Sequence, residues 1–309
     1  MAKHRSLFQK ILLFAGIVCF LGMIPVLLFA VNGLVLAHNE EVVTGLTSHP
    51  AVPPAKEDSG NITLRVMSWN VAKLFVHNGG LSFDPPEKAR KRLQSMADLI
   101  RAEKPDIVFL CEIIKECTPC PVDQIAELAE ATGMHMWTFG ENYNFGLPFY
   151  RIVGGNAILS RFPIQGVTNL NLIGRQPFYV TKNNRRALWC SARIGEQEVL
   201  MASLHNDSYS RKNNLAQAQQ ILAYTGKRDT LMAGDFNAAP HEPPMKVFSE
   251  SNLFSGVFDG PFTFPAGKPR ETIDFILGPA AWEVLEHRVI ASDASDHLPV
   301  LTVFGVKKK

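Results

Sequence analysis

The sequence predicts one α/β or α+β domain preceded by a single transmembrane helix. Two observations predict this fold class. Residues 11–31 form an uncharged apolar stretch of 21 residues near the amino terminus, and residues 62–306 alternate between short strand-like runs and amphipathic helices. Apolar residues make up 46% of the chain and charged residues 19%. This composition excludes a disordered or collagen-like protein.

The apolar stretch is long enough to cross a bilayer, which needs about 20 residues. Lys3, Arg5 and Lys10 precede it. Because cytoplasmic flanks are rich in Lys and Arg, we expect a cytoplasmic basic segment at 1–10, a single-pass signal anchor at 11–37, and the rest outside the cytoplasm. The alternative is secretion after signal cleavage near Ala37, although the apolar core of a signal peptide is normally about 7–15 residues.

The charge is unevenly distributed along the chain. Residues 38–61 are rich in proline and charge and predict an extended linker. The domain is expected at 62–306, and residues 307–309 form a basic tail. Residues 61–306 carry 24 basic and 25 acidic side chains. A near-neutral domain does not support a general basic platform for nucleic acid.

The first half of the domain predicts three strands and two helices. Strands are expected at 62–70, 106–112 and 155–160, and helices from residue 84 onward and at 122–133. Asp84 offers a capping side chain for the first helix, and Pro86 suits its first turn. Gly133 is a typical terminator of the second helix.

The second half predicts more strands than helices. Strands are expected at 185–194, 198–205, 230–235, 273–277 and 299–304, and a helix at 215–226. Within the first half, Cys117 and Cys120 form a C-x-x-C pair that is either a disulfide formed after export or two free thiols. The sequence lacks the second half of a zinc site.

Polar side chains recur where these strands begin or end. They are Asn70, Glu112, His205, Asp235, Asn237, Asp274, Asp296 and His297. Each alone is compatible with a turn or cap. Together, the carboxylates suit Mg²⁺, Mn²⁺ or Ca²⁺, and the histidines can donate protons to an anionic transition state. The set indicates metal-assisted hydrolysis of a phosphate ester. The sequence contains neither a P-loop nor a G-x-S-x-G elbow.

Seven sequence blocks occur in the order found in the endonuclease/exonuclease/phosphatase superfamily, which has the deoxyribonuclease I-like fold. The blocks are SWN, LCE, GNAILSRFPI, SLH, GDFN, TIDFI and SDH, and residues 62–305 resemble that family. The resemblance implies a four-layer α/β/β/α sandwich of two mixed sheets flanked by helices. It also implies a divalent-metal-dependent phosphoric ester hydrolase, either a phosphodiesterase or a phosphatase.

The resemblance assigns a metal site and a water-activating group. It implies that Glu112 is the main metal ligand, that Asn70 helps to form that site, and that Asp296 lies near a second metal position. Asp235 is expected to orient or deprotonate the attacking water, and Asn237 to donate to the phosphate. Mg²⁺ is the favoured cation, with Mn²⁺ and Ca²⁺ as alternatives.

The resemblance also assigns the groups that bind the phosphate. His205 and His297 match the pair that binds and neutralises the scissile phosphate, and Asp274 matches the carboxylate that fixes the tautomer of His297. Asn156 and Arg186 lie in family-typical blocks and are expected to bind substrate.

Two positions depart from the family pattern. Cys111 stands where a Gln usually precedes the metal-binding Glu, and strand alternation predicts that it points away from Glu112. Ala72 stands where the abasic-site nucleases have an Asp, which argues against DNA repair.

The substrate remains open among a lipid headgroup, a small phosphoester and nucleic acid. The membrane is an expected partner through the amino-terminal helix, and no protein partner is expected. One alternative is a surface or secreted nuclease that cuts DNA or RNA, and another is a non-catalytic binding protein on the same fold. A basic patch from Arg185, Arg186, Arg211 and Lys212 is compatible with ordinary solvated charge. Four aromatic residues, Tyr143, Phe145, Phe149 and Tyr150, suit either a substrate rim or minor core packing.

Overall fold

The computed structural model describes residues 6–31, 42–52, 55–56, 62–76, 82–147, 150–174 and 184–306. The helices are α1 (Leu7–Val31), η2 (Ala72–Phe75), α2 (Pro86–Glu103), α3 (Gln124–Thr132), α4 (Arg211–Thr225) and α5 (Pro243–Ser249). The strands are β1 (Val42–Leu46), β2 (Ala55–Lys56), β3 (Ile62–Asn70), β4 (Ile107–Cys117), β5 (Met136–Leu147), β6 (Tyr150–Ser160), β7 (Ile164–Asn171), β8 (Arg186–Ile194), β9 (Gln197–His205), β10 (Thr230–Asp235), β11 (Phe254–Gly256), β12 (Asp274–Pro279), β13 (Glu283–Val289) and β14 (Val300–Val306).

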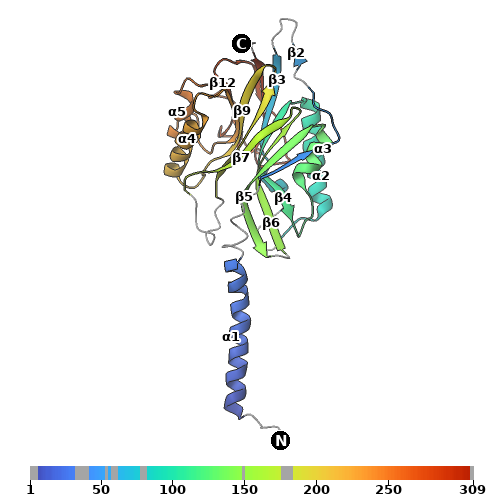
Figure 1. Ribbon diagram of the computed structural model, residues 1–309, viewed down its shortest axis with the longest axis vertical. Coiled ribbons are helices and arrows are strands. Elements are labelled where there is room, and N and C mark those ends of the chain that lie inside the picture. Colours follow the sequence, from blue (N-terminus) through green and yellow to red (C-terminus); the bar gives the residue numbers. More distant parts are fainter. Residues whose placement is uncertain are drawn as a thin grey trace.

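The apolar stretch forms one continuous helix, α1, with none of its residues buried in the protein. It extends away from the globular part of the chain (Figure 1). Its 25 residues are long and apolar enough to cross a membrane or to act as a signal sequence. Pro25 lies inside the helix, and Lys10 lies in its first turns. Lys3, Arg5 and the predicted cleavage region around Ala37 fall outside the described residues, as does the basic tail.

Two mixed sheets form the centre of the globular part. The first sheet has eight strands in the order β1-β5-β6-β4-β3-β14-β13, with β2 paired to β3, and the second has six in the order β11-β12-β10-β9-β8-β7. The pairs β3–β4 and β9–β10 are parallel, whereas the other pairs are antiparallel. The predicted pair of mixed sheets is therefore confirmed.

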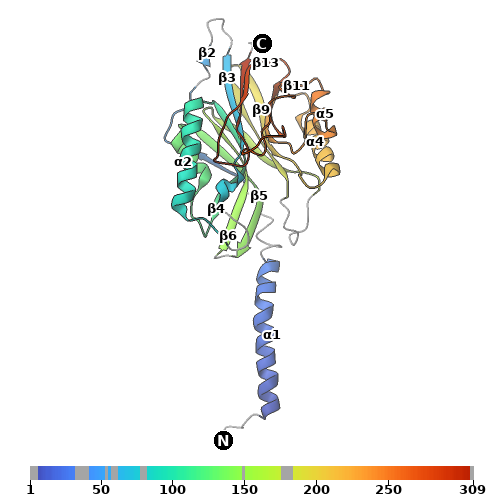
Figure 2. The same ribbon diagram turned by 180° about the vertical axis from the view of Figure 1, so that it is seen from behind.

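The sheets and helices stack in four layers. Helices α2 and α3 cover the outer face of the first sheet, and α4 and α5 cover the outer face of the second (Figures 1 and 2). A third apolar cluster lies between the two sheets. The α/β/β/α sandwich implied by the family resemblance is confirmed.

Strand β3 shows why the central strands have apolar residues on both faces. Leu64 and Val66 pack between the sheets, whereas Met67 and Trp69 pack under α2 and α3. A strand segment that is buried on both faces has no solvent-facing side, so apolar residues occur on both. Thr63 and Arg65, near the start of β3, are half-buried, whereas every residue from Val66 to Asn70 is buried. Asn70 is the last residue of this buried segment.

The segment predicted as a linker, 38–61, contributes two strands, which differs from the sequence prediction. Strand β1 pairs antiparallel with β5, and β2 pairs with β3. The alternating pattern of β1, Val42-Val43-Thr44-Gly45-Leu46, was obscured by the proline and charge around it. Glu40, Glu41 and residues 57–61 lie outside the described part of the chain.

The predicted helices form with two differences at their starts. Helix α2 has Pro85 at its N-cap without a side-chain cap, and Asp84 instead accepts hydrogen bonds from Lys88 and Arg92 at 3.1 and 2.6 Å. Helix α4 begins at Arg211 behind the capping side chain of Ser210, several residues earlier than its apolar pattern indicated.

Strand β5 was not predicted, because its polar sequence hides a hairpin with β6. Tyr143 on this strand is partly buried and packs against the core, and burial raises the pKa of its phenol. Tyr150 packs edge-on against Phe83. Phe149 lies outside the described residues. Cys117 and Cys120 are both buried, free thiols.

Candidate active site

The ends of four strands from both sheets converge at one edge of the sandwich. Strands β9 and β10 run parallel, so that Asp235 at the end of β10 is paired with His205 at the end of β9. Strand β12 runs the other way, and its first residue, Asp274, is paired with Asp235. In the first sheet, Asn70 ends β3 beside Cys111 of the parallel strand β4. Strand register alone therefore brings three of the predicted site residues together in the second sheet, His205, Asp235 and Asp274.

Asn70 connects the two sheets at this edge. Its amide Nδ2 donates to Asp235 Oδ2 at 3.1 Å and lies 3.5 Å from His297 Nε2. Its Oδ1 accepts a hydrogen bond from the backbone of Ala72 at 3.0 Å. Asn70 is 2% exposed, so water does not compete for these bonds. The side chain is thus fixed between the backbone of its own turn and the carboxylate of the other sheet.

A β-bulge places Glu112 at the same edge. Cys111 and Glu112 together oppose the single residue Asn156 of β6, and Glu112 has a φ of 54°. A bulge of this kind re-aims the side chain that it displaces. Glu112 accepts a hydrogen bond from the ammonium of Lys73, and its Oε1 lies 3.7 Å from His205 Nε2.

The bulge also changes the surroundings of Cys111. This residue was expected to point away from Glu112 and to have little effect on the chemistry. It is fully buried, and burial, followed by the charges of Asp235 and Asp274, raises the pKa of its thiol well above the usual range. The thiol of Cys111 is therefore influenced by the carboxylates of the second sheet, although Cys111 belongs to the first.

His297 and Asp274 form a buried hydrogen-bonded pair. His297 Nδ1 lies 2.9 Å from Asp274 Oδ2, and the imidazole stacks at a tilt against Phe264. Burial alone lowers the pKa of His297, but the charge and hydrogen bond of Asp274, with a contribution from Asp235, raise it to about 10. His297 is therefore a cation at neutral pH, and the pairing implied for Asp274 is present in the structure.

His205 has the opposite protonation state. Burial and then the positive charge of Arg185 lower its pKa well below the usual value. Its Nε2 lies 3.5 Å from Asp235 Oδ2. Burial raises the pKa of Asp235 to about 7, with His297 opposing this shift and Asp274 reinforcing it. The site thus combines a neutral histidine, a protonated histidine and a carboxylate that changes charge near neutral pH.

Asn237 stabilises the loop after β10. Its backbone N–H donates to Asp235 Oδ1 at 2.9 Å, and its Nδ2 donates to the carbonyl of Asn206 at 3.0 Å. Asn237 has a φ of 47°, a conformation that Asn adopts more readily than most residues. The side chain expected to donate to phosphate is bonded to the protein in this structure.

Asn156 and Arg186, which were expected to bind substrate, are instead buried between the sheets. Asn156 Nδ2 donates to the carbonyls of Arg186 and Ser203 at 2.9 and 3.3 Å. The guanidinium of Arg186 donates to Asn171 and to the carbonyl of Glu141. Because Asn156 opposes the bulge, its bonds hold in place the backbone that aims Glu112.

Asp296 was expected near a second metal position, and that role stays a prediction. Its side chain is exposed, and Ser295 Oγ donates to it at 3.4 Å. Its charge contributes to the raised pKa of His297. Among the described residues, the ligand atoms that lie within 4.8 Å of one another belong to Asp235, Asp274 and His297.

The donor set fits a divalent cation. Glu112, which is reachable from solvent with a side-chain exposure of 19%, and the amide oxygen of Asn70 are hard oxygen donors of the kind that Mg²⁺ prefers. The buried Asp235 carboxylate has a pKa of about 7, and a nearby cation would stabilise its charged form. Lys73 supplies a positive charge to Glu112, so its ammonium would compete with a metal ion for that carboxylate.

Lys73 and Arg185 were not identified as site residues from the sequence. Lys73 lies in a turn, Ala72–Phe75, whose four residues all have positive φ values between 43° and 58°. The sequence of this turn contains no glycine or other motif that predicts positive φ values. Arg185 precedes β8 and lies 2.8 Å from both ring nitrogens of His205. Strand alternation could have separated it from Arg186, had the strand's start been known.

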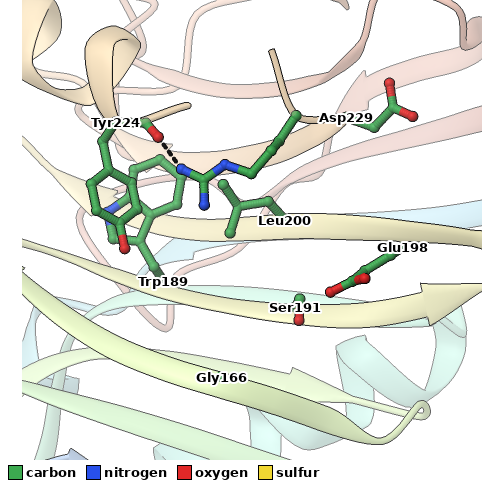
Figure 3. Close-up of a pocket in the computed structure, with 8 residues that line it drawn as sticks. Gly166, Trp189, Ser191, Glu198, Leu200, Tyr224 and Asp229 are labelled. Carbon is green, nitrogen blue, oxygen red and sulfur yellow. Dashed lines mark hydrogen bonds between the residues drawn. The ribbon is translucent and has the colours of Figure 1, made fainter. Parts of the chain in front are cut away.

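A surface hollow lies away from this cluster. Figure 3 shows it between Trp189, Tyr224 and Leu200, on the outer face of the second sheet beside the end of α4, with a volume of about 330 Å³. Its lining shares no residue with the acid and histidine cluster. The side chain of Arg228 lies over the ring of Tyr224.

Solved structures with the same fold include proteins of several named activities. An endonuclease/exonuclease/phosphatase from Beutenbergia cavernae is 23% identical, with a TM-score of 0.61 over 79% of this chain and 72% of that chain. The catalytic domain of human nocturnin, with a bound sulfate anion, is 21% identical, with a TM-score of 0.59 over 86% and 96%. A mannosyl-6-phosphatase from Bacteroides thetaiotaomicron is 17% identical, with a TM-score of 0.56 over 78% and 99%. The TM-scores show that these proteins share the fold of this chain.

The sequence itself shows the family. A search of curated proteins finds no match. The sequence model of the endonuclease/exonuclease/phosphatase family matches residues 67–297. This range includes every residue of the assembled site, from Asn70 to His297. The chain therefore belongs to the endonuclease/exonuclease/phosphatase family, whose members are hydrolases that act on phosphoesters.

Proposed function

We propose that this protein is a divalent-metal-dependent phosphoester hydrolase that acts close to a membrane surface. The observation that carries the proposal is a chain of contacts across the two sheets. Asn70 donates to Asp235 and lies beside His297, which is hydrogen-bonded to Asp274. A base, a fixed donor and a cation at one edge are the groups that attack of water on phosphorus requires.

Asp235 is the group that activates water in this proposal. Its pKa of about 7 makes it a stronger base than an ordinary carboxylate while leaving much of it ionised at neutral pH. Asn70 and the backbone of Asn237 hold one oxygen each, so the direction of the carboxylate is fixed. An oriented carboxylate aligns the attacking water before reaction.

The two histidines stabilise the charge that develops on phosphorus. His297 carries a positive charge, and its Nε2 lies 3.8 Å from Asp235 Oδ2. His297 can therefore contact the same phosphoryl group that the water held by Asp235 attacks. It can donate a proton to a phosphoryl oxygen or to the leaving group. His205 is neutral and can donate a hydrogen bond without adding charge. Each such preorganised donor contributes roughly 3–4 kcal/mol in comparable sites.

Glu112 and Asn70 would hold the divalent cation. When bound, the cation would offset the negative charge of the phosphate that otherwise repels the nucleophile. The bulge that aims Glu112 and the inter-sheet bonds of Asn156 keep this ligand at the edge where Asp235 and the histidines meet.

Val42, the first described residue after α1, lies at the same level of the first sheet as Glu112. Val42, the first residue of β1, is paired with Gly140 of β5, which is paired with Asn156 of β6, and Asn156 opposes the bulge at Glu112. Neighbouring strands are about 4.8 Å apart, so three steps separate Val42 from Glu112 by about 14 Å. Residues 32–41 join Val42 to α1, and ten residues span at most about 36 Å.

The direction of the strands agrees with this placement. Figures 1 and 2 both show the carboxyl terminus at the end of the globular part remote from α1. Strand β3 runs antiparallel to β14, with Ile62 paired to Val306 and Ser68 to Val300, so Asn70 lies at the end nearer α1. We infer that α1 is a membrane anchor and, from the basic residues before it, that the domain is outside the cytoplasm.

Turnover of a substrate panel by the full chain in detergent or vesicles tests the proposal. The panel contains phosphomonoesters, phosphodiesters, DNA, RNA and phospholipid, each with Mg²⁺ and with a chelator. We expect metal-dependent hydrolysis of at least one ester. Cleavage confined to DNA or RNA would replace the proposal with a surface nuclease, and metal binding without any turnover would replace it with a binding protein.

A further inference from the structure

Arg185 is a buried cation at the edge of the site. It lies immediately before β8 and is 7% exposed. Its Nη1 is 2.8 Å from both ring nitrogens of His205, and its Nη2 donates to Ser208 Oγ at 3.1 Å. Its Nε is buried and finds no hydrogen-bond partner among the residues that the structure describes. The guanidinium is therefore only partly satisfied by the protein.

The charge of Arg185 lacks a direct counter-ion. Within the described part of the chain, no carboxylate lies within 4.0 Å of its guanidinium, and neither His205 nor Ser208 supplies a negative charge. The other cations of the site are paired, Lys73 with Glu112 and His297 with Asp274. Burying an unpaired cation is costly, so this arrangement suits a site whose anion arrives with the ligand.

The position of Arg185 identifies the part of the ligand that it meets. His205, which it touches, lies 3.5 Å from Asp235 and 3.7 Å from Glu112. Arg185 is thus one side chain away from the groups that surround the reacting phosphorus in the proposed function. A guanidinium matches the oxygens of a phosphoryl group in geometry and charge.

We propose that Arg185 binds a non-bridging oxygen of the substrate's phosphoryl group and that its unpaired charge favours phosphomonoesters over phosphodiesters. The proposal rests on the phosphoester hydrolase proposed above. A monoester carries close to two negative charges above pH 7, because its second pKa is about 6, whereas a diester carries one. An additional cation therefore stabilises the bound monoester more than the bound diester.

The first experiment compares a monoester and a diester that have the same leaving group, p-nitrophenyl phosphate and methyl p-nitrophenyl phosphate, at pH 8 with Mg²⁺. The full chain is compared with Arg185→Gln, Arg185→Lys and the matched control Lys212→Gln, which removes an exposed cation of α4. For Arg185→Gln we expect kcat/KM to fall at least about tenfold for the monoester and less than about threefold for the diester.

The other variants give the direction of the effect. Arg185→Lys should keep part of the preference for the monoester. Lys212→Gln should leave kcat/KM unchanged for both substrates. An equal fall for both substrates in Arg185→Gln would show that Arg185 only positions His205 and would overturn the proposal. Unchanged kinetics would overturn it as well.

The second experiment does not depend on turnover. Calorimetry measures the binding of inorganic phosphate and dimethyl phosphate to the wild-type chain, to Arg185→Gln and to Arg185→Lys. We expect wild type to bind phosphate at least about tenfold more tightly than dimethyl phosphate, and Arg185→Gln to lose most of that difference. If Arg185→Gln does not fold, the affinities of wild type and Arg185→Lys for the two anions still test the proposal.

The two proposals can fail separately. Equal affinity of wild type for the two anions overturns the role of Arg185 even if hydrolysis is observed. Selective phosphate binding that depends on Arg185, without turnover of any ester, supports the anion site and removes the hydrolase.

Discussion

Two histidines of the site differ in charge because their neighbours differ. His297 and His205 are both buried, and burial disfavours the charged form of each. His297 has Asp274 at hydrogen-bond distance, which reverses the effect of burial, whereas His205 has Arg185. A residue type therefore does not define a role here, since the partner decides whether the imidazole is a cation or a neutral donor.

Replacement of Asp274 by Asn tests the origin of the His297 charge. The change removes the charge and hydrogen bond of Asp274, which are the largest influences raising the pKa of His297. Burial, which lowers this pKa, remains, as do the smaller raising effects of Asp235 and Asp296. We therefore expect the pKa of His297 to fall from about 10 toward its usual value of 6.5. Nuclear magnetic resonance titration of the imidazole measures it, and a pKa that stays well above 6.5 would contradict this origin of the charge.

The same pair predicts a pH dependence of stability. The folded-state pKa of His297 is raised from 6.5 to about 10, so the folded protein binds this proton more tightly than the unfolded chain does. The stabilisation is fully present below pH 6.5 and is lost as the pH rises through about 10. The stability difference between wild type and Asp274→Asn should therefore shrink over that window in denaturation curves.

Lys73 gives a prediction about metal affinity. Its ammonium occupies the carboxylate of Glu112, so Lys73→Met should remove a competing cation. We expect divalent-cation binding, measured by calorimetry, to tighten by up to about tenfold. Lys88→Met is the matched control, because Lys88 pairs with Asp84 on the surface of α2. Unchanged or weaker binding in Lys73→Met would refute competition at Glu112.

The sequence predicts some site residues better than others, for a physical reason. Asn70, His205 and Asp235 each end an apolar run, so burial of the run fixes where the polar residue emerges. Lys73 depends on a left-handed turn, and Arg185 differs from Arg186 by one position along the chain. A one-residue difference moves a side chain to the other face of the sheet, and no local pattern showed which arginine faces the site.

At the scale of elements, the close approach of β9 and β10 requires a glycine beside Asp235, the proposed water-activating group. Gly234 has a φ of 147°, and a Cβ atom there would lie 1.9 Å from the carbonyl oxygen of Leu204. Leu204 and Gly234 are paired, directly before the pair His205–Asp235. The glycine thus allows the two strand ends to align their functional side chains.

Gly234→Ala should destabilise the fold and separate these strand ends. Strained φ and a backbone clash together are expected to lower the free energy of unfolding by about 3 kcal/mol or more. Denaturant unfolding followed by circular dichroism measures the change. Gly267→Ala is the matched control, because no atom lies within 4 Å of the place that its new methyl group would take. Equal stability of the two variants would show that β9 can shift to relieve the clash.

The elements that the sequence predicts well are those buried on both faces or capped by clear signals. Strand β3 and helix α3, with Asp123 at its N-cap and Gly133 at its C-cap, are of this kind. Strands β1 and β5 were missed, since β1 is a short edge strand close to prolines and β5 carries two buried asparagines and a buried glutamate. Their stability comes from pairing with other strands, which no local pattern records.

At the scale of the whole molecule, the domain should be held with its active edge toward the membrane. A fluorophore on a cysteine at exposed Asp293, four residues before His297, should transfer energy to a bilayer dye more efficiently than one at Glu283. Glu283 is paired with Gly305, which is paired with Thr63 at the start of β3, so it lies at the opposite end of the sheet from Asn70.

The control for this measurement lengthens the connection between α1 and β1. Insertion of a flexible Gly/Ser segment of about 20 residues adds roughly 25 Å of average reach and should reduce the difference between the two positions. Equal transfer from Asp293 and Glu283 in the unmodified chain would contradict a membrane-facing site while leaving the chemistry intact.

Activation of water by Asp235, for metal-dependent attack on phosphorus, is the step on which the proposed function depends most. The most direct test is the initial rate of ester hydrolysis against Mg²⁺ concentration for wild type and Asp235→Asn. Because burial disfavours the Asp235 carboxylate, the neutral Asn variant should fold as stably as wild type. We expect its rate at saturating Mg²⁺ to fall at least about 100-fold. Turnover close to wild type in the folded variant would contradict this role of Asp235. Turnover that persists in chelator would contradict the metal dependence of the reaction.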